Sequence, residues 1–453
     1  MVTDMKEAGE LSAVGKIFHR MRQFRGRSGM GPRLARGAFW STGGGVFSGA
    51  LTLLQSIVLA RILGVGDFGK LGLVYNTVGM FGALAGFGLG MGTAKHVANL
   101  RRQAPEEMWA VIRLSTYSVL ATSGLVALVL WFAARGLAIR YLGDSALTTA
   151  IRIGVALLCL NAWNGVQVGV LTGLERFRGV ALIRAVNVVV SLCGATLGAR
   201  WHGVNGALVG AAVGVLVACL LSRFLVYRST DVRIPRVSVG RVARRLLLDT
   251  SFPMFLAGLL PTAGMWYVGT LLARSENGYS QMGIFNAANS WFTIVAFGAN
   301  CLVQPLLPIF ASGGSASGGA EDRLLGILLR IVSGAGALVA LAVGLCAPWI
   351  MRLYGAEFAS GYWTLIVVAL TGLLYCLCNL LSTFIMARRS GWLWLLLQAI
   401  WTGVLAIGAT VLGTATSLAY ATSRFTAYAV QVAIEMGLTR KSWAAPKPVA
   451  ESR

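Results

Sequence analysis

Charged side chains are scarce in this sequence: only 12% of its 453 residues are Asp, Glu, Lys or Arg. Soluble globular proteins carry about twice that share. Hydrophobic residues make up 56% of the chain, and its mean hydropathy is +0.72. This composition excludes an ordinary soluble domain and predicts a polytopic membrane protein.

Catalytic and metal-binding patterns are also missing. The three histidines, His19, His96 and His202, fall near the ends of apolar runs or in loops. No serine–histidine–acid set or phosphate-binding glycine loop is found, so we expect neither an enzyme nor an ATPase. Cys376 and Cys378 have no second ligand pair, and all seven cysteines lie in apolar stretches. We therefore expect no catalytic residue, no metal site and no cofactor.

Acidic residues are absent from the middle of every predicted membrane span. Proton- and sodium-coupled carriers usually keep a carboxylate at that depth. This lack argues against cation-coupled drug efflux. The acids that we place in loops or at helix ends are Asp67, Asp144, Glu175, Asp249, Glu276, Glu357 and Glu435.

Long apolar runs dominate what is present. A helix that crosses a bilayer needs about 20 apolar residues, and twelve such runs occur. Continuous runs of this length do not alternate as barrel strands do, so the fold class is an all-α polytopic bundle. The twelve runs span residues 38–60, 71–92, 108–132, 148–172, 181–200, 203–227, 249–272, 282–308, 324–350, 361–386, 392–412 and 414–436.

The net charge of +23 is concentrated in alternate loops. Cytoplasmic loops carry the excess of Lys and Arg, so both termini are predicted to be cytoplasmic. No aromatic–basic RNA motif accompanies the charge, and we expect no nucleic-acid partner. The basic loops hold the N-terminal cluster and then Lys95, Arg101, Arg102, Arg176, Arg178, Arg228, Arg233, Arg236, Arg241, Arg244, Arg245, Arg323, Arg388, Arg389, Arg440 and Lys441.

Short stretches recur about 210 residues apart, which suggests two related halves. Each half holds six spans, so the halves share one orientation and are related by a pseudo-two-fold along the membrane normal. The recurring pairs are Tyr75-Asn76 with Phe285-Asn286, Phe87-Gly88 with Phe297-Gly298, Leu59-Ala60-Arg61 with Leu272-Ala273-Arg274, and Gly194-Ala195-Thr196 with Gly408-Ala409-Thr410.

The halves define the expected domains. Residues 1–37 form a basic N-terminal segment, either an amphipathic helix on the inner leaflet or a disordered tail. Residues 38–227 form the first six-helix lobe and 249–436 the second. A cytoplasmic linker, 228–248, joins them, and 437–453 form a cytoplasmic tail.

Three arginines are candidates for binding an anionic substrate. Arg424 lies inside the last span, where an arginine costs at least about 2.5 kcal/mol and should meet a wet cavity or an anion. Arg61 and Arg274 end the first and seventh spans at equivalent places and could hold a pyrophosphate together. The alternatives are hydrogen bonds to carbonyls for Arg424 and ordinary interfacial anchoring for the other two.

Amide and aromatic side chains inside the spans complete the candidate site. Such groups suit sugar rings, although many intramembrane amides only join helices. Asn76 and Asn286 are equivalent in the two halves. The candidates are Gln55, Asn76, Asn286, Asn289, Trp266 and Trp291.

Two prolines, Pro253 and Pro261, fall in the seventh span. Proline removes a backbone donor, so we expect a functional bend, with simple packing as the alternative.

The stretch LARILGVGDFGKLGLVYNTVGMFGALAGFGLG, beginning at Leu59, resembles the opening of Wzx-type polysaccharide flippases. These belong to the multidrug/oligosaccharidyl-lipid/polysaccharide exporter superfamily. The family pattern A-R-x-L-G, then F-G, then F-G-L is matched here. GLERFR at 173–178 and LYGAEFASGYWTLIVVAL from Leu353 fit as well. The matching residues are Ala60, Arg61, Leu63, Gly64, Phe68, Gly69, Phe87, Gly88 and Leu89.

The resemblance implies two lobes that work by alternating access, with the first, second, seventh and eighth helices lining the cavity. It implies a polyprenyl-pyrophosphate-linked oligosaccharide as cargo, moved across the bacterial inner membrane for exopolysaccharide, capsule or O-antigen synthesis. Membrane lipids and a polysaccharide polymerase are the other expected partners. A multidrug or small-molecule antiporter of the same superfamily is the alternative function, and a membrane glycosyltransferase or polymerase is a third class.

Overall fold

The computed structural model describes residues 30–86, 88–101, 105–229, 252–303, 320–388, 391–413 and 415–444, and within these ranges every regular element is helical. The linker 228–248 lies almost wholly outside the described residues, as do residues 1–29 and 445–453. The first half contains α2 (Met30–Gly86), α3 (Leu89–Leu100), α4 (Pro105–Leu137), η1 (Ala138–Leu142), α5 (Leu147–Gly173) and α6 (Phe177–Ser229). The second half contains α8 (Phe252–Ala273), α9 (Gly278–Val303), α11 (Ala320–Leu345), α12 (Ala347–Tyr354), η3 (Ala356–Gly361), α13 (Tyr362–Arg388), α14 (Gly391–Leu412) and α15 (Ser417–Ala444).

Two of these helices are double. α2 is broken at Gly64, whose φ of 74° is open to glycine but strained for other residues. α6 is broken at His202 and Gly203, where Gly203 has a φ of 55°. Each double helix holds two spans, so α2, α4, α5, α6, α8, α9, α11, α13, α14 and α15 together supply twelve.

The predicted membrane spans are therefore confirmed in number and order. Among the described residues, seven stretches are long and apolar enough to cross a membrane. Two of them, of 44 and 53 residues, exceed the length of one crossing and are the double helices. The more polar α9 and α15, together with α8, complete the set. The chain is a multi-pass membrane protein.

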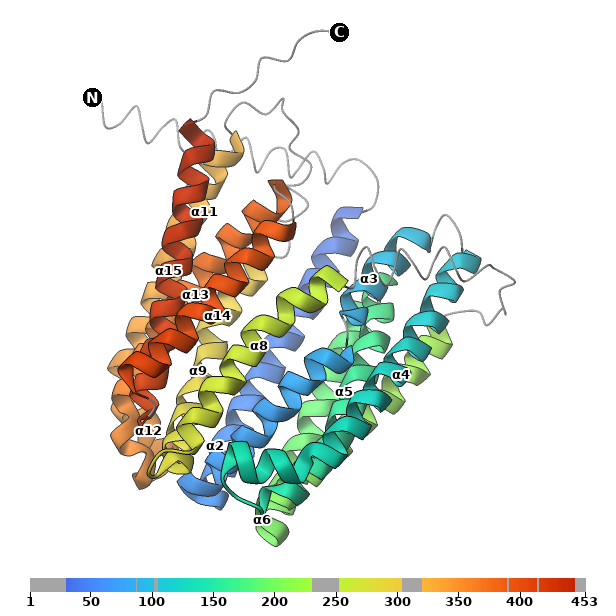
Figure 1. The fold of residues 1–453 in the computed structure, drawn as a ribbon. Coiled ribbons are helices and arrows are strands. Elements are labelled where there is room, and N and C mark those ends of the chain that lie inside the picture. The colour runs from blue at the N-terminus through green and yellow to red at the C-terminus, as the bar shows by residue number, and fades with distance from the viewer. Residues whose placement is uncertain are drawn as a thin grey trace, which may run out of the picture.

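The helices form two lobes (Figure 1). α2 to α6 form one lobe, in which α2 packs against α5 and α6. α8 to α15 form the other, in which α13 packs against α9, α11 and α15. The lobes meet mainly where α2 packs against α8 and α9, and they diverge toward the upper end of the view. The predicted all-α, two-lobe architecture is confirmed.

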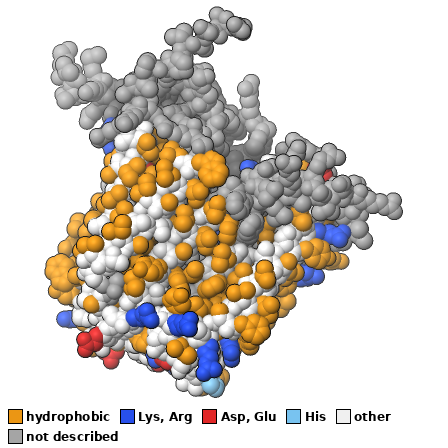
Figure 2. Space-filling view, in the orientation of Figure 1, with side chains coloured by type: hydrophobic (Ala, Val, Ile, Leu, Met, Phe, Trp, Pro, Cys, Tyr) orange, Lys and Arg blue, Asp and Glu red, His pale blue; other side chains and the backbone are white. Residues whose placement is uncertain are grey.

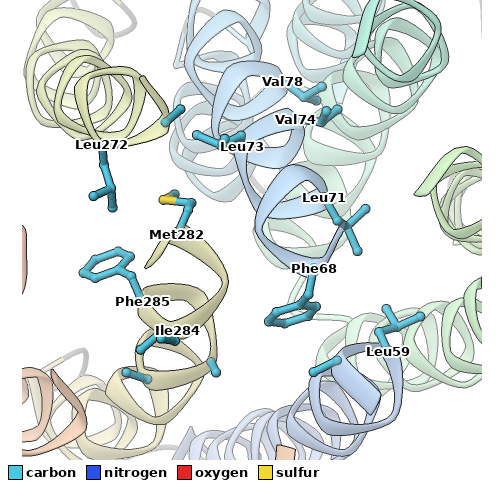
Figure 3. Packing of buried hydrophobic residues seen from close by; sticks show 14 of the residues in the cluster. Leu59, Phe68, Leu71, Leu73, Val74, Val78, Leu272, Met282, Ile284 and Phe285 are labelled. Carbon is cyan, nitrogen blue, oxygen red and sulfur yellow. The ribbon is translucent and has the colours of Figure 1, made fainter. Parts of the chain in front are cut away.

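Apolar packing and small residues hold the lobes together. Leu73 of α2 and Met282 of α9 point into the space between the two helices (Figure 3). Glycines permit the close approach, because a Cβ at Gly69 or Gly72 would overlap α9 atoms and one at Gly283 would overlap the Val65 carbonyl. The contact is thus fixed by shape as well as by hydrophobic burial.

Exposed apolar side chains mark the surface that faces lipid. Figure 2 shows hydrophobic side chains over most of the visible face, with basic side chains gathered near its lower edge. Trp131, Trp201, Trp349 and Trp363 are exposed at helix ends on one side of the bundle. Tryptophans at that level are typical of a membrane interface.

Candidate functional site between the two lobes

Three hydrogen bonds join the lobes at one end of the bundle, and we call this set the lobe clasp. The Arg61 Nε donates to the Leu353 carbonyl oxygen at 2.6 Å. The Val65 amide donates to Glu357 Oε2 at 3.2 Å. The Tyr279 hydroxyl donates to the Leu142 carbonyl oxygen at 2.5 Å. Each bond connects one lobe to the other.

A charged group stands beside the clasp. Lys70 Nζ lies 3.1 Å from Asp144 and 3.7 Å from Asp67, and 5.3 Å from the centre of the Tyr279 ring. Partial burial would raise the pKa of Asp144, but the Ala146 amide at 2.9 Å and Lys70 outweigh it. The pKa of Asp144 is therefore held below its ordinary value, and the carboxylate is ionised at neutral pH.

Aromatic rings seal the same end. Phe68 of α2 meets Phe358 of η3 edge-on, with ring centroids 6.1 Å apart. Tyr354 packs on Phe358 at 5.8 Å. Tyr354 and Phe358 are buried, so water is excluded between the lobes here.

Arg274 and Arg61 lie at this same end, as their equivalent positions predict. Arg274 is exposed in the turn after α8. Arg61 is also exposed, but its guanidinium binds a carbonyl of the other lobe. In this conformation Arg61 therefore joins the lobes.

Arg424 and Asn289, two further predicted site residues, are brought together inside the second lobe. Arg424 is only 6% exposed, and its guanidinium donates to Asn289 Oδ1 at 2.5 Å. The guanidinium carbon lies 4.0 Å from the centre of the Phe292 ring and 5.9 Å from that of Tyr428. Its Nε has no hydrogen-bond partner, and no carboxylate is paired with it among the described residues. This buried cation retains an unused donor, which an anion could accept from.

The seam between α2, α8 and α9 collects most of the predicted amide and indole groups. Trp266 Nε1 donates to Thr77 Oγ1 at 3.2 Å. Half-buried Asn76 lies beside Gly269 of α8. The Asn286 and Trp291 side chains each hold a buried nitrogen without a partner. A buried donor without a partner is energetically unfavourable, so both nitrogens could still donate a hydrogen bond to a polar ligand.

Gln55 is not brought to this seam. Its Nε2 approaches the Ser191 carbonyl oxygen of α6 at 3.5 Å, which joins two helices of the first lobe. On α2 the neighbouring Ser56 faces the seam instead and lies 2.8 Å from Ser290 of α9.

The two prolines of α8 differ in position. Pro261 lies in the interior of the helix, where its missing donor leaves a carbonyl unpaired one turn earlier. Pro253 lies in the first turn of the described helix, where no intrahelical donor is required. The side chain of Pro253 lies outside the described residues.

The predicted position of Glu435 at a loop or helix end is wrong. Glu435 is fully buried within α15, which continues to Ala444, and so it does not lie at a helix end. The helix outruns the apolar stretch because its buried face is polar. Arg424, Tyr428, Gln431 and Glu435 follow the helical repeat along that face, which is the signal that could have found it. Within the described residues, no group of three or more His, Cys, Asp or Glu could hold a metal ion.

The comparisons with known proteins agree with this arrangement. Residues 34–313 match the family model described as "Polysaccharide biosynthesis protein". The chain is 27% identical over 181 residues to the lipid III flippase of Escherichia coli (strain K12), which covers 40% of the chain and 43% of that relative, so less than half of the relative's length is spanned. It is 22% identical over 402 residues to the EPS I polysaccharide export inner membrane protein EpsE of Ralstonia solanacearum, covering 83% and 89%.

Solved structures share the fold at low identity. An inward-facing multidrug resistance MATE family transporter of the MOP superfamily superposes with a TM-score of 0.71 at 16% identity, covering 90% of this chain and all of that one. The lipid II flippase MurJ, in an inward closed conformation, gives 0.71 at 12%, covering 88% and 87%.

Proposed function

Because the chain belongs to the polysaccharide biosynthesis protein family, we propose that it flips a polyprenyl-pyrophosphate-linked oligosaccharide across the bacterial inner membrane. The cargo would serve exopolysaccharide, capsule or O-antigen synthesis. The relatives named as a lipid III flippase and a polysaccharide export protein support this class of cargo. Alternating access between the lobes is the proposed mechanism.

The observation that carries the proposal is the one-ended contact between the lobes. The lobe-to-lobe bonds described above run from the clasp to the Ser56–Ser290 and Thr77–Trp266 pairs. Beyond that level, Val46 and Phe47 of α2 are 53% and 50% exposed. A pair of lobes held at one end can exchange that contact for one at the other end, which is what alternating access requires.

The positive-inside rule indicates on which side of the membrane this contact lies. With both termini and the 228–248 linker in the cytoplasm, the clasp lies on the periplasmic side. The conformation is then closed to the periplasm. Lipid-linked cargo would enter between the lobes from the cytoplasmic leaflet, with its polyprenyl tail left among the membrane lipids.

Arg424 is the proposed contact for the pyrophosphate. Its guanidinium is buried, carries an unused Nε donor and is held by a neutral amide of Asn289. A phosphate oxygen would replace a neutral acceptor by a charged one, which strengthens the bond. Arg61 and Arg274, at the clasp end, would meet the headgroup only after the clasp opens.

The amide and indole groups of the seam are proposed to contact the sugars. Asn286 and Trp291 have buried nitrogens without partners, and Asn76 and Trp266 lie on the facing helices. Sugar hydroxyls can accept from all of these donors. Gln55, bonded toward α6, would take part only after a rearrangement of the first lobe. Pro261, and with it Pro253, is proposed to let α8 bend as the lobes exchange contacts.

A multidrug or small-molecule antiporter of the same superfamily is the second candidate. The likeness in fold to a multidrug resistance transporter favours it. The chemistry of the interior does not favour a cationic drug, because Arg424 is a buried cation and no carboxylate is paired with it among the described residues.

Reconstitution separates the two functions. The purified protein would be placed in vesicles with a fluorescent lipid-linked oligosaccharide, and a glycosidase added outside would report the fraction of sugar exposed there. We expect the protein to accelerate exchange between leaflets, while a strain lacking its own drug pumps gains no drug resistance from it. Resistance without lipid exchange would favour the antiporter. Copurification with a polysaccharide polymerase would test that partner.

A further inference from the structure

The two carboxyl oxygens of Glu435 differ in their hydrogen bonding: one accepts three hydrogen bonds and the other accepts none. Its Oε1 accepts from the Ser382 hydroxyl at 2.6 Å, from Gln431 Nε2 at 3.1 Å and from the Cys378 thiol at 3.8 Å. Its Oε2 is buried and has no hydrogen-bond partner. The whole side chain is buried where α15 packs on α13.

Among the described side chains, none provides a counter-charge to this acid. Within the described residues, no Lys, Arg or His forms an ion pair with Glu435. From α13 the titratable group that faces it is Cys378, and on α15 itself Tyr428 lies two turns away. On α11, Leu329 packs against the hydrophobic cluster around Cys378 and Val432, and the next residue, Arg330, is exposed. α14 contains no titratable residue.

The other buried charge of α15 is too far away to compensate. Arg424 precedes Glu435 by eleven residues, or about 16 Å along the axis. A bare carboxylate in such a place is strongly disfavoured by the loss of water. The three donors to Oε1 stabilise the ionised form and so oppose that effect. Because these two effects oppose each other, the protonation state of Glu435 depends on how the surrounding residues are packed and on access of water.

A proton fits the site better than a metal ion. A proton on Oε2 would neutralise the charge at the oxygen that receives no donor. Sodium or calcium would require several oxygen ligands around that atom. The described polar neighbours instead present an N–H, a thiol and a hydroxyl that already donate to Oε1.

We propose that Glu435 is a proton-binding site of the second lobe, and that it loads and releases its proton during the transport cycle. The transport part of this inference rests on the proposed flippase function. While α13 and α15 are packed as seen here, the carboxyl group is neutral. If the packing of α13 on α15 loosens as the lobes move, water reaches Oε2 and accepts the proton, leaving a hydrated carboxylate.

Infrared difference spectroscopy of the purified full-length protein tests the proton directly. Spectra in acid and alkaline buffer should show a neutral-carboxyl C=O band that disappears on alkalinisation, and Glu435→Gln should abolish this band. The matched control, Glu276→Gln, changes an exposed glutamate and should leave it intact. Ser382→Ala removes a donor to the ionised form and should move the transition to higher pH. A band that persists at every pH, or one that responds to sodium instead of pH, overturns the proposal.

Transport measurements test the coupling separately. In vesicles, a pH difference across the membrane should change the rate of lipid-linked oligosaccharide exchange in the wild type, and Glu435→Gln should lose this response. An unchanged response in Glu435→Gln overturns the coupling. If the wild type moves no lipid-linked oligosaccharide at all, the flippase function fails, while the infrared transition still decides the proton site.

Discussion

The Arg61 guanidinium donates a hydrogen bond to the Leu353 carbonyl oxygen at 2.6 Å, although the two residues are 292 positions apart in sequence. Arg61 ends the first membrane span and Leu353 lies in α12, so this bond joins the two lobes. The bond gives Arg61 a role that can be separated from substrate binding.

Arg61→Ala should shift the lobes away from the closed contact. A hydrogen bond to a charged group at an exposed site contributes about 1 kcal/mol, which corresponds to about a fivefold change in the population of the closed state. Spin labels at the exposed residues Arg200 and Trp349, one on each lobe at this end, would report the distance by pulsed electron resonance. Arg352→Ala, which changes an exposed neighbour of Leu353, is the control. Equal distance distributions for all three proteins would show that Arg61 does not hold the lobes.

Acid should weaken the same end through Asp144. A group whose pKa is lowered in the folded protein stabilises it above the ordinary pKa, and the effect is lost as pH falls through the lowered value. Because Lys70 and the Ala146 amide lower the pKa of Asp144, its contribution is present at neutral pH and disappears in acid. Asp144→Asn should destabilise the detergent-solubilised protein slightly at neutral pH, by less than about 1 kcal/mol, and not in strong acid. A melting temperature reduced equally at every pH would contradict this account.

Arg424→Ala should abolish or strongly reduce glycan export without loss of protein from the membrane. The guanidinium is the buried cation proposed to bind pyrophosphate, and its removal also leaves Asn289 without its partner. Arg424→Lys keeps the charge but loses the planar fork, so it should retain partial activity. Arg152→Ala is a matched control, because Arg152 also stacks on an aromatic ring, Trp131, but is exposed. Surface polysaccharide measured against membrane protein abundance would decide, and full export by Arg424→Ala would refute the role.

Gly72→Ala should separate α2 from α9. An added Cβ would overlap the Asn286 side chain, and overpacking of this kind costs about 1 to 3 kcal/mol. Gly79→Ala, two turns further along the same helix, meets open space and is the matched control. Thermal unfolding of the two variants gives the comparison. An equal effect of both changes would mean that helix propensity and not lobe contact decides the result.

The sequence predicted the spans well because a bilayer imposes one length on every apolar helix. It did not predict the clasp, because Arg61 and Leu353 meet only after both lobes have formed, and no periodic pattern links them. Glu435 was misplaced for another reason. Its burial comes from packing of α13 on α15 within the lobe, where a polar face is covered by protein and not by lipid. The pairing of Arg424 with Asn289 joins two residues that the sequence had singled out separately.

Pro261 should be the flexible point of α8. Its ring removes one intrahelical hydrogen bond, whereas Pro253, in the first turn of the described helix, removes none. Pro261→Ala should restore that bond and raise the free energy of unfolding by up to about 3 kcal/mol. It should also slow export, because α8 packs against both α2 and α14 and, in the proposed mechanism, changes its course when the lobes exchange contacts. Pro253→Ala is the comparison variant, and because Pro253 lies in the first turn of the described helix it should change both quantities less than Pro261→Ala does. Spin labels at the two ends of α8 would report its bend, with export measured in the same strains. If Pro261→Ala leaves both the distance distribution and the export rate unchanged, α8 moves as a rigid body and the proline serves only to pack the helix.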